Sequence, residues 1–492
     1  MDVERSALPG GPVVWRAALV VLVLVGLFLR APALDAPPVD GHHVRQADTA
    51  SMARIMAREG ATLWTPRIGW AGPEAGPVES EFPLYQALVG TIWGAVGSEP
   101  PVVPRLLSLL AWFLGGLALA RLSRRAIPDV PLALTLGLYV LSPMGILLSR
   151  SIQPDALAVA LLVGAWALVD GATEGRRPAE QLIGGGLLLG LAIAVKAPVI
   201  LWAPPIALSA WRQRQDLPTP AKAVAVGLAL VPPVVWYLHA HALGVDGASF
   251  KLWGADSGKW TTPAALTDTA LWTRVAVGVV RELLTPVAGA LLLVGAVLAR
   301  RPTLTPAVLG VIIGVATPLL LLPGVATHGY YLLPMLPFAS LVLGAGVAWL
   351  WRTLSGAGTP AGALVGAVVA IALVVVSVRG SASFLGWGYS RDARIETIAG
   401  AARQVLPPGT ATIVVDRHPQ TLLYALDQRG WHRDKVSERA IWQLRSWGGE
   451  ALLLTNTSPT WDDDYVVREL LSTHPIVARG EGWTLLRLDV TH

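Results

Sequence analysis

Residues 37–60 read PPVDGHHVRQADTASMARIMAREG, and residues 79–86 read ESEFPLYQ, within a polar stretch bounded by two apolar runs. These runs, at 13–29 and 102–121, are near the roughly 20 residues with which an α-helix crosses a bilayer. Charged and imidazole side chains just beyond a spanning helix are costly to keep dry, so they usually serve chemistry or bind ions or substrate. The stretch therefore predicts a membrane protein whose first loop carries a candidate site.

The composition indicates the same class. Of the 492 residues 53% are hydrophobic and 14% are charged, and the mean hydropathy is +0.55, which is too apolar for an ordinary soluble protein. The chain has no cysteine, which excludes thiol nucleophiles, disulfides and Cys-based zinc sites. The net charge of +5 comes from short basic clusters between apolar runs rather than from one patch with interleaved aromatics, which argues against a nucleic-acid partner.

Apolar runs recur along most of the chain. They predict a polytopic α-helical membrane protein with about eleven transmembrane helices. The first run follows Arg16 like a signal peptide, but it joins directly to the polar loop, so we interpret it as an uncleaved anchor. The expected spans are 13–29, 102–121, 131–148, 155–170, 182–196, 198–211, 222–240, 283–299, 305–322, 331–350 and 361–379.

Basic residues alternate between loops and predict the orientation. The opposite short loops hold little beyond Arg150 and Lys196. The positive-inside rule then places the N-terminus in the cytoplasm and the first loop, 30–101, outside a bacterial inner (cytoplasmic) membrane. The expected cytoplasmic clusters are Arg121, Arg124 and Arg125; Arg176 and Arg177; Arg212, Arg214 and Lys222; Arg300 and Arg301; and Arg352.

Residues 386–492 differ in composition from the transmembrane part, residues 1–380. Runs at 412–416 (TIVVD) and 451–455 (ALLLT) predict buried strands, and residues 476–479 and 483–488 flank a Gly-Glu-Gly turn as in a hairpin. Helical patterns occupy 392–405, 438–447 and 463–471. We expect a small α/β domain, which an odd number of spans places on the periplasmic or extracellular side.

Four stretches of the chain stand out together: PVDGHHVRQADTA (38–50), ESEFPLYQ (79–86), SRSIQPDALA (149–158) and HGYYLLPMLPFASLVLGAG (328–346). They resemble motifs of the GT-C superfamily of membrane glycosyltransferases. The resemblance is to the branch of protein O-mannosyltransferases and lipid A aminoarabinose transferase (glycosyltransferase family 39-like). Two departures concern the substrate more than the chemistry: Gly41 rather than a second acid follows Asp40, and Glu81 and Phe82 stand where the aminoarabinose enzyme has a lysine.

The resemblance implies transfer of a hexosyl or pentosyl group from a polyprenyl-phosphate sugar donor to an extracytoplasmic lipid, glycan or protein. Such a reaction needs a carboxylate that accepts the proton of the attacking hydroxyl, and Asp40 or Asp48 suits this role. It also needs cations that stabilise the leaving phosphate, a role for Arg45, Arg150 and Lys196. The other candidate substrate-binding residues are His43, Glu81, Tyr85, Asp155, His328, Tyr330 and Tyr331.

The sequence specifies no cofactor. A divalent metal held by His42, His43 and Asp40 is an open alternative, and so is a role for the two histidines as ordinary interfacial side chains. Each charged candidate also has a structural interpretation. Asp40 could cap the helix that starts near His43, and Asp48 could pair with Arg45 one turn earlier.

The same holds for the candidates in later loops. Lys196 could reach the interface without a function, and Arg150 could pair with Asp155 across a turn at Pro154. His328, Tyr330 and Tyr331 could be an aromatic belt. Two other functions also stay open: a transporter or flippase of lipid-linked or small polar substrates, and a receptor that uses the C-terminal domain.

Overall fold

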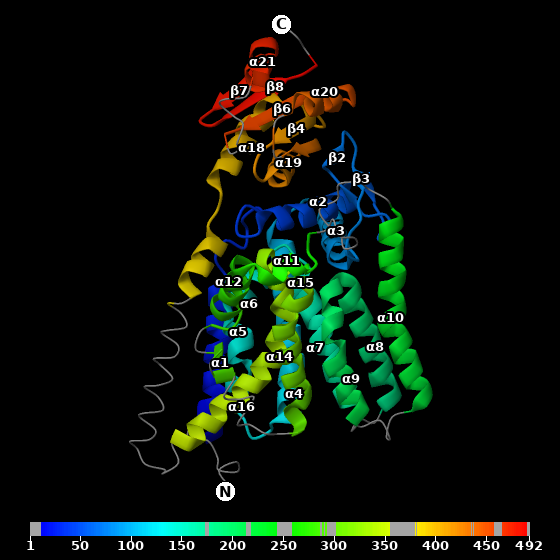
Figure 1. Ribbon diagram of the computed structural model, residues 1–492, viewed down its shortest axis with the longest axis vertical. Helices are drawn as coiled ribbons and strands as arrows, with labels where there is room; N and C mark the ends of the chain where they lie inside the picture. The colour runs from blue at the N-terminus through cyan, green and yellow to red at the C-terminus, as the bar shows by residue number, and fades with distance from the viewer. Residues whose placement is uncertain are drawn as a thin grey trace. The chain divides into compact units, whose positions relative to one another are not determined.

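The computed structural model describes residues 11–172, 177–212, 218–243, 258–285, 288–289, 291–292, 302–354, 379, 381–433, 435, 437–456 and 465–489 (Figure 1). The chain divides into two compact units. The helical unit comprises Met1–Pro32, Leu106–His239 and Lys251–Trp387. The sheet unit comprises Ala33–Arg105, Ala240–Phe250 and Gly388–His492.

Most helices of the helical unit follow the predicted apolar runs. Pro263–Thr267 and Thr269–Val277 do not, because they lie between the predicted runs 222–240 and 283–299. Proline at the first turn of several helices lacks the backbone N–H that a helix start leaves unused, and so favours a new helix at that point. The α-helices are α1 (Gly11–Arg30), α4 (Val102–Ala126), α5 (Leu132–Leu141), α6 (Pro143–Leu148), α7 (Asp155–Gly171), α8 (Pro178–Val195), α9 (Ala203–Arg212), α10 (Thr219–Ala242), α11 (Pro263–Thr267), α12 (Thr269–Val277), α14 (Thr305–Ala316), α15 (Pro318–Thr327) and α16 (Leu336–Leu354). Short 3₁₀ segments are η2 (Ala197–Trp202), η5 (Pro302–Leu304) and η6 (Gly329–Met335), and η4 (Gly278–Leu283) is a π-helix.

Within these described ranges, 5 helices are long and apolar enough to cross a membrane. A sixth span results if α14 and α15, which bend by 67° at their junction, count together. The predicted run 131–148 is divided between α5 and α6, and the run 198–211 begins as a 3₁₀ segment before α9. The predicted run 361–379, apart from residue 379, and most of 283–299 lie outside the described residues, so the total of about eleven spans stays a prediction.

Glycines on α8 set the position of its C-terminal end. A Cβ atom on Gly186 would lie 2.3 Å from the carbonyl oxygen of Ala225, and one on Gly190 would lie 2.1 Å from that of Leu228. Both carbonyls belong to α10, so the two helix backbones approach more closely than any side chain would permit. This tight packing fixes the position of α8, whose C-cap residue is Lys196.

The sheet unit is a three-layer α/β structure. Its main sheet has the strand order β2-β5-β4-β6-β8-β7. The central strands β5, β4 and β6 run parallel, and β2, β8 and β7 are antiparallel to their neighbours. The elements are α2 (His43–Glu59), β1 (Arg67–Ile68), β2 (Ala71–Gly72), β3 (Gly76–Pro77), α3 (Leu84–Val96), α18 (Ala393–Val405), β4 (Ala411–Val415), α19 (Pro419–Leu426), β5 (Arg429–Arg433), α20 (Glu438–Ser446), β6 (Ala451–Thr455), α21 (Tyr465–Thr473), β7 (Ile476–Gly480) and β8 (Trp483–Arg487).

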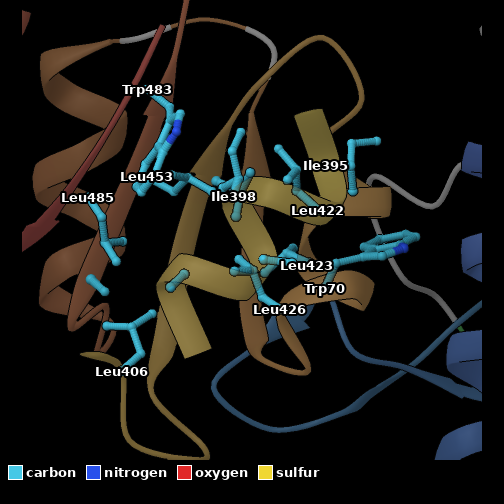
Figure 2. Close-up of a cluster of buried hydrophobic side chains, with 14 of the residues drawn as sticks. Trp70, Ile395, Ile398, Leu406, Leu422, Leu423, Leu426, Leu453, Trp483 and Leu485 are labelled. Carbon is cyan, nitrogen blue, oxygen red and sulfur yellow. The ribbon is translucent and has the colours of Figure 1, made fainter. Parts of the chain in front are cut away.

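Alternate residues of the strands pack against helices on the two faces of this sheet. On one face Ile413 and Leu452 contact the core formed with α20 and α21. On the other face Val414 and Leu453 pack with Ile398 and with other side chains of α18 and α19 (Figure 2). Strands buried on both faces are expected to be apolar throughout, which is why TIVV and ALLL were recognisable in the sequence.

The polar loop after the first apolar run belongs to this same core. The sequence predicts that the loop 30–101 belongs to the transmembrane part, whereas in the structure Ile68, Trp70 and Val78 are buried against α18 and α19. Trp70 is labelled in Figure 2. Strand β2 of the loop also pairs with β5 through Ala71–Trp431 and Gly72–Gly430. The loop therefore folds together with the residues that follow Trp387.

We expect a cavity in this shared core to destabilise both parts at once. Ile398→Ala removes a fully buried side chain and should cost about 2–5 kcal/mol of unfolding free energy. Hydrogen exchange should then increase together in α2 and α18. Val405→Ala, on the same helix but 42% exposed, is the matched control and should change little. Exchange that increases in α18 alone would show that the loop folds independently.

Candidate functional site

Asp48 is a buried carboxylate on the second turn of α2, with 2% of its surface exposed. The indole Nε1 of Trp70 donates a hydrogen bond to its Oδ1 at 2.8 Å. Burial raises the pKa of Asp48 to about 6, although this hydrogen bond and the charge of Arg45 oppose the shift. A carboxylate with this proton affinity is suited to accept a proton near neutral pH.

Asp40 is also buried, but it is held differently. Both of its oxygens interact with the guanidinium of Arg105, each at 3.2 Å, and the amide of Gln46 donates to Oδ1 at 2.7 Å. Asp40 does not cap the following helix, because the N-cap residue of α2 is His42 in a left-handed conformation. Gly41 lies so close to Gly388 that a Cβ atom would be 2.8 Å from its Cα, so a second acid would not fit there.

The other candidates of this loop are engaged within the sheet unit. Arg45 forms an ion pair with Glu81, whereas the structural interpretation of the sequence paired it with Asp48. The Tyr85 hydroxyl donates to the carbonyl of Pro104 at 2.6 Å. His43 Nδ1 lies 2.9 Å from the hydroxyl of Thr421, and burial and the nearby His418 lower the pKa of His43 to about 4. His43 is therefore neutral near pH 7.

Asp48 also lines a small polar cavity of about 50 Å³ between α2 and α19. Arginines contribute much of its wall. Arg54 and Arg58 both pair with Glu99 and Asp427. The cavity gives the carboxylate a polar environment, and Trp70, which donates to Asp48, also lines it.

In the helical unit the motif SRSIQPD (149–155) forms a turn whose side chains are all buried. Arg150 Nη2 donates to the carbonyl of Pro32 at 2.6 Å, and Asp155 begins α7. Within the described parts of the chain, both polar atoms of the Gln153 amide and Oδ2 of Asp155 have no hydrogen-bond partner. Buried polar atoms are rarely left unsatisfied, so this turn is suited to bind a polar ligand.

Lys196 lies beside that turn. Its Nζ is 3.2 Å from Asp155 Oδ1, and only about one twentieth of its side chain is exposed. The ammonium group lies 4.9 Å from the ring centroid of Tyr330 and 5.5 Å from that of Tyr331. The His328 ring is within 5.3–5.6 Å of both tyrosine rings. The structure therefore gathers Lys196, Asp155 and the His-Tyr-Tyr motif into one group, the Lys196 cluster.

An apolar groove of about 320 Å³ reaches this cluster. Its walls come from η2, α10, α15 and the end of α8, and Tyr331 belongs both to the groove and to the Lys196 cluster. A groove of this apolar lining is suited to a hydrocarbon chain, and the lysine offers a cation near the place where the groove meets Tyr331. Snorkelling does not describe Lys196, because its charged end is buried and paired.

The described ranges contain no group of three or more His, Cys, Asp or Glu side chains that could hold a metal ion. His42, His43 and Asp40 are thus not gathered into such a group. His43 faces His418 instead, with ring centroids 4.5 Å apart.

Comparison with known proteins places this geometry in context. Residues 83–237 match the family described as Dolichyl-phosphate-mannose-protein mannosyltransferase. No curated protein matches the chain. Among solved structures, ArnT from Cupriavidus metallidurans bound to undecaprenyl phosphate has a TM-score of 0.66 at 15% identity, covering 96% of this chain and 98% of that chain.

Two further structures are similar. The archaeal oligosaccharyltransferase AglB from Archaeoglobus fulgidus, in complex with an inhibitory peptide and a dolichol-phosphate, has a TM-score of 0.57 at 10% identity, covering 89% of this chain and 69% of that chain. The arabinofuranosyltransferase AftD from Mycobacteria has a TM-score of 0.55 at 15% identity, covering 98% of this chain and 42% of that chain.

The chain therefore has a helical, GT-C-like fold with several apolar helices. It resembles the GT-C glycosyltransferases both in this fold and in the sequence of residues 83–237, as the four motifs predicted. The matched segment contains Tyr85, the SRSIQPD turn and Lys196.

Two residues that organise the carboxylates are not among the candidates that the sequence predicts. Arg105 holds Asp40, and Trp70 donates to Asp48. An arginine near the start of a spanning helix is unusual enough to have been a signal. Trp70 gave none, because tryptophans are scattered along the chain. The sequence also allows a pair between Arg150 and Asp155, but in the structure Asp155 pairs with Lys196.

Removing the charge of Asp48 and removing that of Asp40 should change the unfolding free energy in opposite directions. Folding raises the pKa of Asp48 from an ordinary 3.8 to about 6, so the ionised carboxylate destabilises the folded state. This destabilisation is fully present above pH 6 and absent below about pH 4. At pH 8, Asp48→Asn should raise the unfolding free energy by about 3 kcal/mol. Asp40→Asn should lower it by about 3 kcal/mol, because it leaves Arg105 buried without its counter-ion.

Thermal unfolding of the purified protein at pH 8 and pH 4.5 measures both effects. The stabilisation by Asp48→Asn should shrink at the lower pH. A lower unfolding temperature for Asp48→Asn at pH 8 would show that Asp48 contributes to stability as an ordinary structural carboxylate.

Proposed function

We propose that the protein transfers a sugar from a polyprenyl-phosphate donor to an extracytoplasmic acceptor. The observation that carries this proposal is the apolar groove that ends at Tyr331, beside the buried Lys196 cluster. An amphiphile with a long apolar tail and an anionic head fits this arrangement, with the tail in the groove and the phosphate at Lys196. Undecaprenyl phosphate, bound in the structurally similar ArnT, is such a molecule.

The polar groups of the turn before α7 suit the rest of the donor. Lys196 stabilises the charge of the leaving phosphate, and Tyr330 and Tyr331 surround its ammonium group. The Gln153 amide and Asp155 Oδ2, which have no hydrogen-bond partner among the described residues, are available to sugar hydroxyls. Lys196 separates from Asp155 only in part when a phosphate binds, because an ammonium group donates three hydrogen bonds.

The proposed proton acceptor is Asp48, and Asp40 is the second candidate. Asp48 accepts one hydrogen bond from Trp70, lines a polar cavity and has a pKa near 6. Asp40 already accepts from Arg105 and Gln46, so it would have to release one of them to bind an acceptor hydroxyl. The acceptor itself is a lipid, a glycan or a protein outside the cytoplasm, which the orientation of the basic loops favours.

A transporter or flippase is the rival function. It would move its substrate without making a glycosidic bond. Mass spectrometry of envelope lipids and glycans distinguishes the two: cells without the chain should lack one sugar on an acceptor and accumulate a polyprenyl-phosphate sugar. An unchanged glycan profile would contradict the transferase proposal.

Donor binding should depend on Lys196. Lys196→Met removes the cation beside the groove and should weaken binding of undecaprenyl phosphate at least about tenfold, since hydrogen bonds to a charged group contribute about 1.5–3 kcal/mol. Lys196→Arg should bind better than Lys196→Met. Lys222, on α10, does not line the groove, so Lys222→Met is the charge-matched control. Equal affinities for all four proteins would remove Lys196 from the donor site.

Turnover should depend on Asp48. The Asp48→Asn variant keeps size and most hydrogen bonding but cannot accept the proton, so turnover should fall about 100- to 10,000-fold with donor binding intact. The rate of the unsubstituted protein should decline as the pH falls below about 6, where Asp48 becomes protonated. If Asp48→Asn turns over normally and a folded Asp40→Asn does not, Asp40 is the base.

A further inference from the structure

A second cavity, of about 540 Å³, lies within the helical unit between α1, α4 and α5. It shares no lining residue with the groove at Tyr331. Most of its wall is apolar, formed by side chains such as Leu19, Val23 and Leu136. A cavity of this size is large enough for a ligand rather than only a few water molecules.

One end of this cavity carries a basic cluster. Arg121, Arg124 and Arg125 line it from the last turns of α4. Arg125 is paired with Asp170 at 2.6 Å. Arg121 and Arg124 are exposed, and no ion pair joins either of them to another residue that the structure describes. Three residues apart on a helix, their side chains lie on the same face.

Trp112, Tyr139 and Arg30 line the other end. The Trp112 and Tyr139 rings stack, with centroids 4.2 Å apart and planes within 9°. Arg30 is fully buried and donates to the hydroxyl of Ser149 at 2.6 Å. From Trp112 to Arg124 the cavity follows α4 for about 18 Å, at 1.5 Å per residue. This length is close to one leaflet, half of a hydrocarbon core of about 30 Å.

We propose that this cavity is a binding site for an anionic phospholipid. The phosphate of the headgroup binds to Arg121 and Arg124, and an acyl chain lies along α4 over Gly116 and Leu117 toward Trp112. Charge complementarity supports this occupant, because the alternating basic loops place the C-terminal end of α4 on the cytoplasmic side, where the membrane surface is anionic. Basic clusters between transmembrane helices on that side bind such headgroups.

The proposed donor is a poorer occupant. Its phosphosugar reacts on the outer side in the expected orientation, whereas the arginines lie at the inner end of α4. A phospholipid at this position would fill the space between α1 and α4 and thereby stabilise the helical unit. The site is independent of the transferase proposal, since it uses none of the residues assigned to donor binding or proton transfer.

The test uses the purified full chain in neutral micelles. Phosphatidylglycerol, phosphatidylcholine and undecaprenyl phosphate are added separately, and native mass spectrometry and thermal unfolding report binding. Phosphatidylglycerol should be retained and raise the unfolding temperature, and phosphatidylcholine should do neither. The double variant Arg121→Gln/Arg124→Gln should bind phosphatidylglycerol about tenfold or more weakly, since each basic residue near an anionic headgroup contributes severalfold.

Two further variants make the result specific. Arg177→Gln removes a charge expected on the same side of the membrane, but Arg177 does not line the cavity and should not matter. Gly116→Leu fills the cavity without changing charge and should also reduce retention. A Cβ there would meet the Tyr139 ring at 3.5 Å, an ordinary contact, so the fold should tolerate it. Unfolding without added lipid checks each variant's fold.

Three results would overturn the proposal. The first is equal retention of phosphatidylglycerol and phosphatidylcholine. The second is retention of phosphatidylglycerol that neither the arginine variant nor Gly116→Leu reduces. The third is undecaprenyl phosphate retained in preference to phosphatidylglycerol and lost in the arginine variant, which would make the cavity a site for the lipid carrier.

Discussion

The shared core of the sheet unit is the constraint on which the candidate carboxylates depend. The loop that follows α1 is too polar and too short to bury a core of its own, and it completes one instead by placing Ile68, Trp70 and Val78 against α18 and α19. Two residues of β2 extend the main sheet through β5. Trp70 thereby takes a fixed place, from which its indole reaches Asp48. The environment of a residue near position 50 is thus determined by residues beyond position 390, and no local property of the loop accounts for it.

Burial of charge follows a consistent pattern in the chain. Lys196 pairs with Asp155, and Arg105 pairs with Asp40, and all four side chains are almost fully buried. Such pairs contribute little net stability, because desolvation offsets their attraction, yet breaking one is costly. Their retention in a chain that is only 14% charged indicates a purpose other than stability. For Lys196 that purpose is suggested by the groove beside it. For Arg105 it is positional, because the guanidinium also holds the carbonyl of Ala36 and so fixes the path of the chain after α1.

The sequence predicted those features that a local pattern encodes. The strands near 412–416 and 451–455, the hairpin near 476–488 and the helix near 392–405 were found because apolar period and turn chemistry are local. Strand β2 was not predicted, because a strand of two residues shows no alternation of apolar and polar side chains. Its partner strand also lies some 360 residues away in the sequence. For the site, the Lys196 cluster was identified residue by residue, but its pairing was not. Arg150 is nearer to Asp155 along the chain, but α8 packs against α7, at whose start Asp155 lies, and this packing brings Lys196 to Asp155.

Asp40 and Asp48, eight residues apart in the chain, illustrate how two identical side chains acquire different chemistry. Asp40 meets a guanidinium and an amide that saturate both oxygens, so its carboxylate acts as a fixed anchor between the start of α2 and the start of α4. Asp48 meets an indole N–H and a small polar cavity, and burial outweighs this hydrogen bond and the charge of Arg45, and so keeps its proton affinity high. A site that needs both a rigid frame and a proton acceptor benefits from such a division, because the group that transfers a proton must change its charge while the frame must not. The physical difference between the two carboxylates lies in their partners, Arg105 and Trp70. The sequence around Asp40 and Asp48 does not identify these partners.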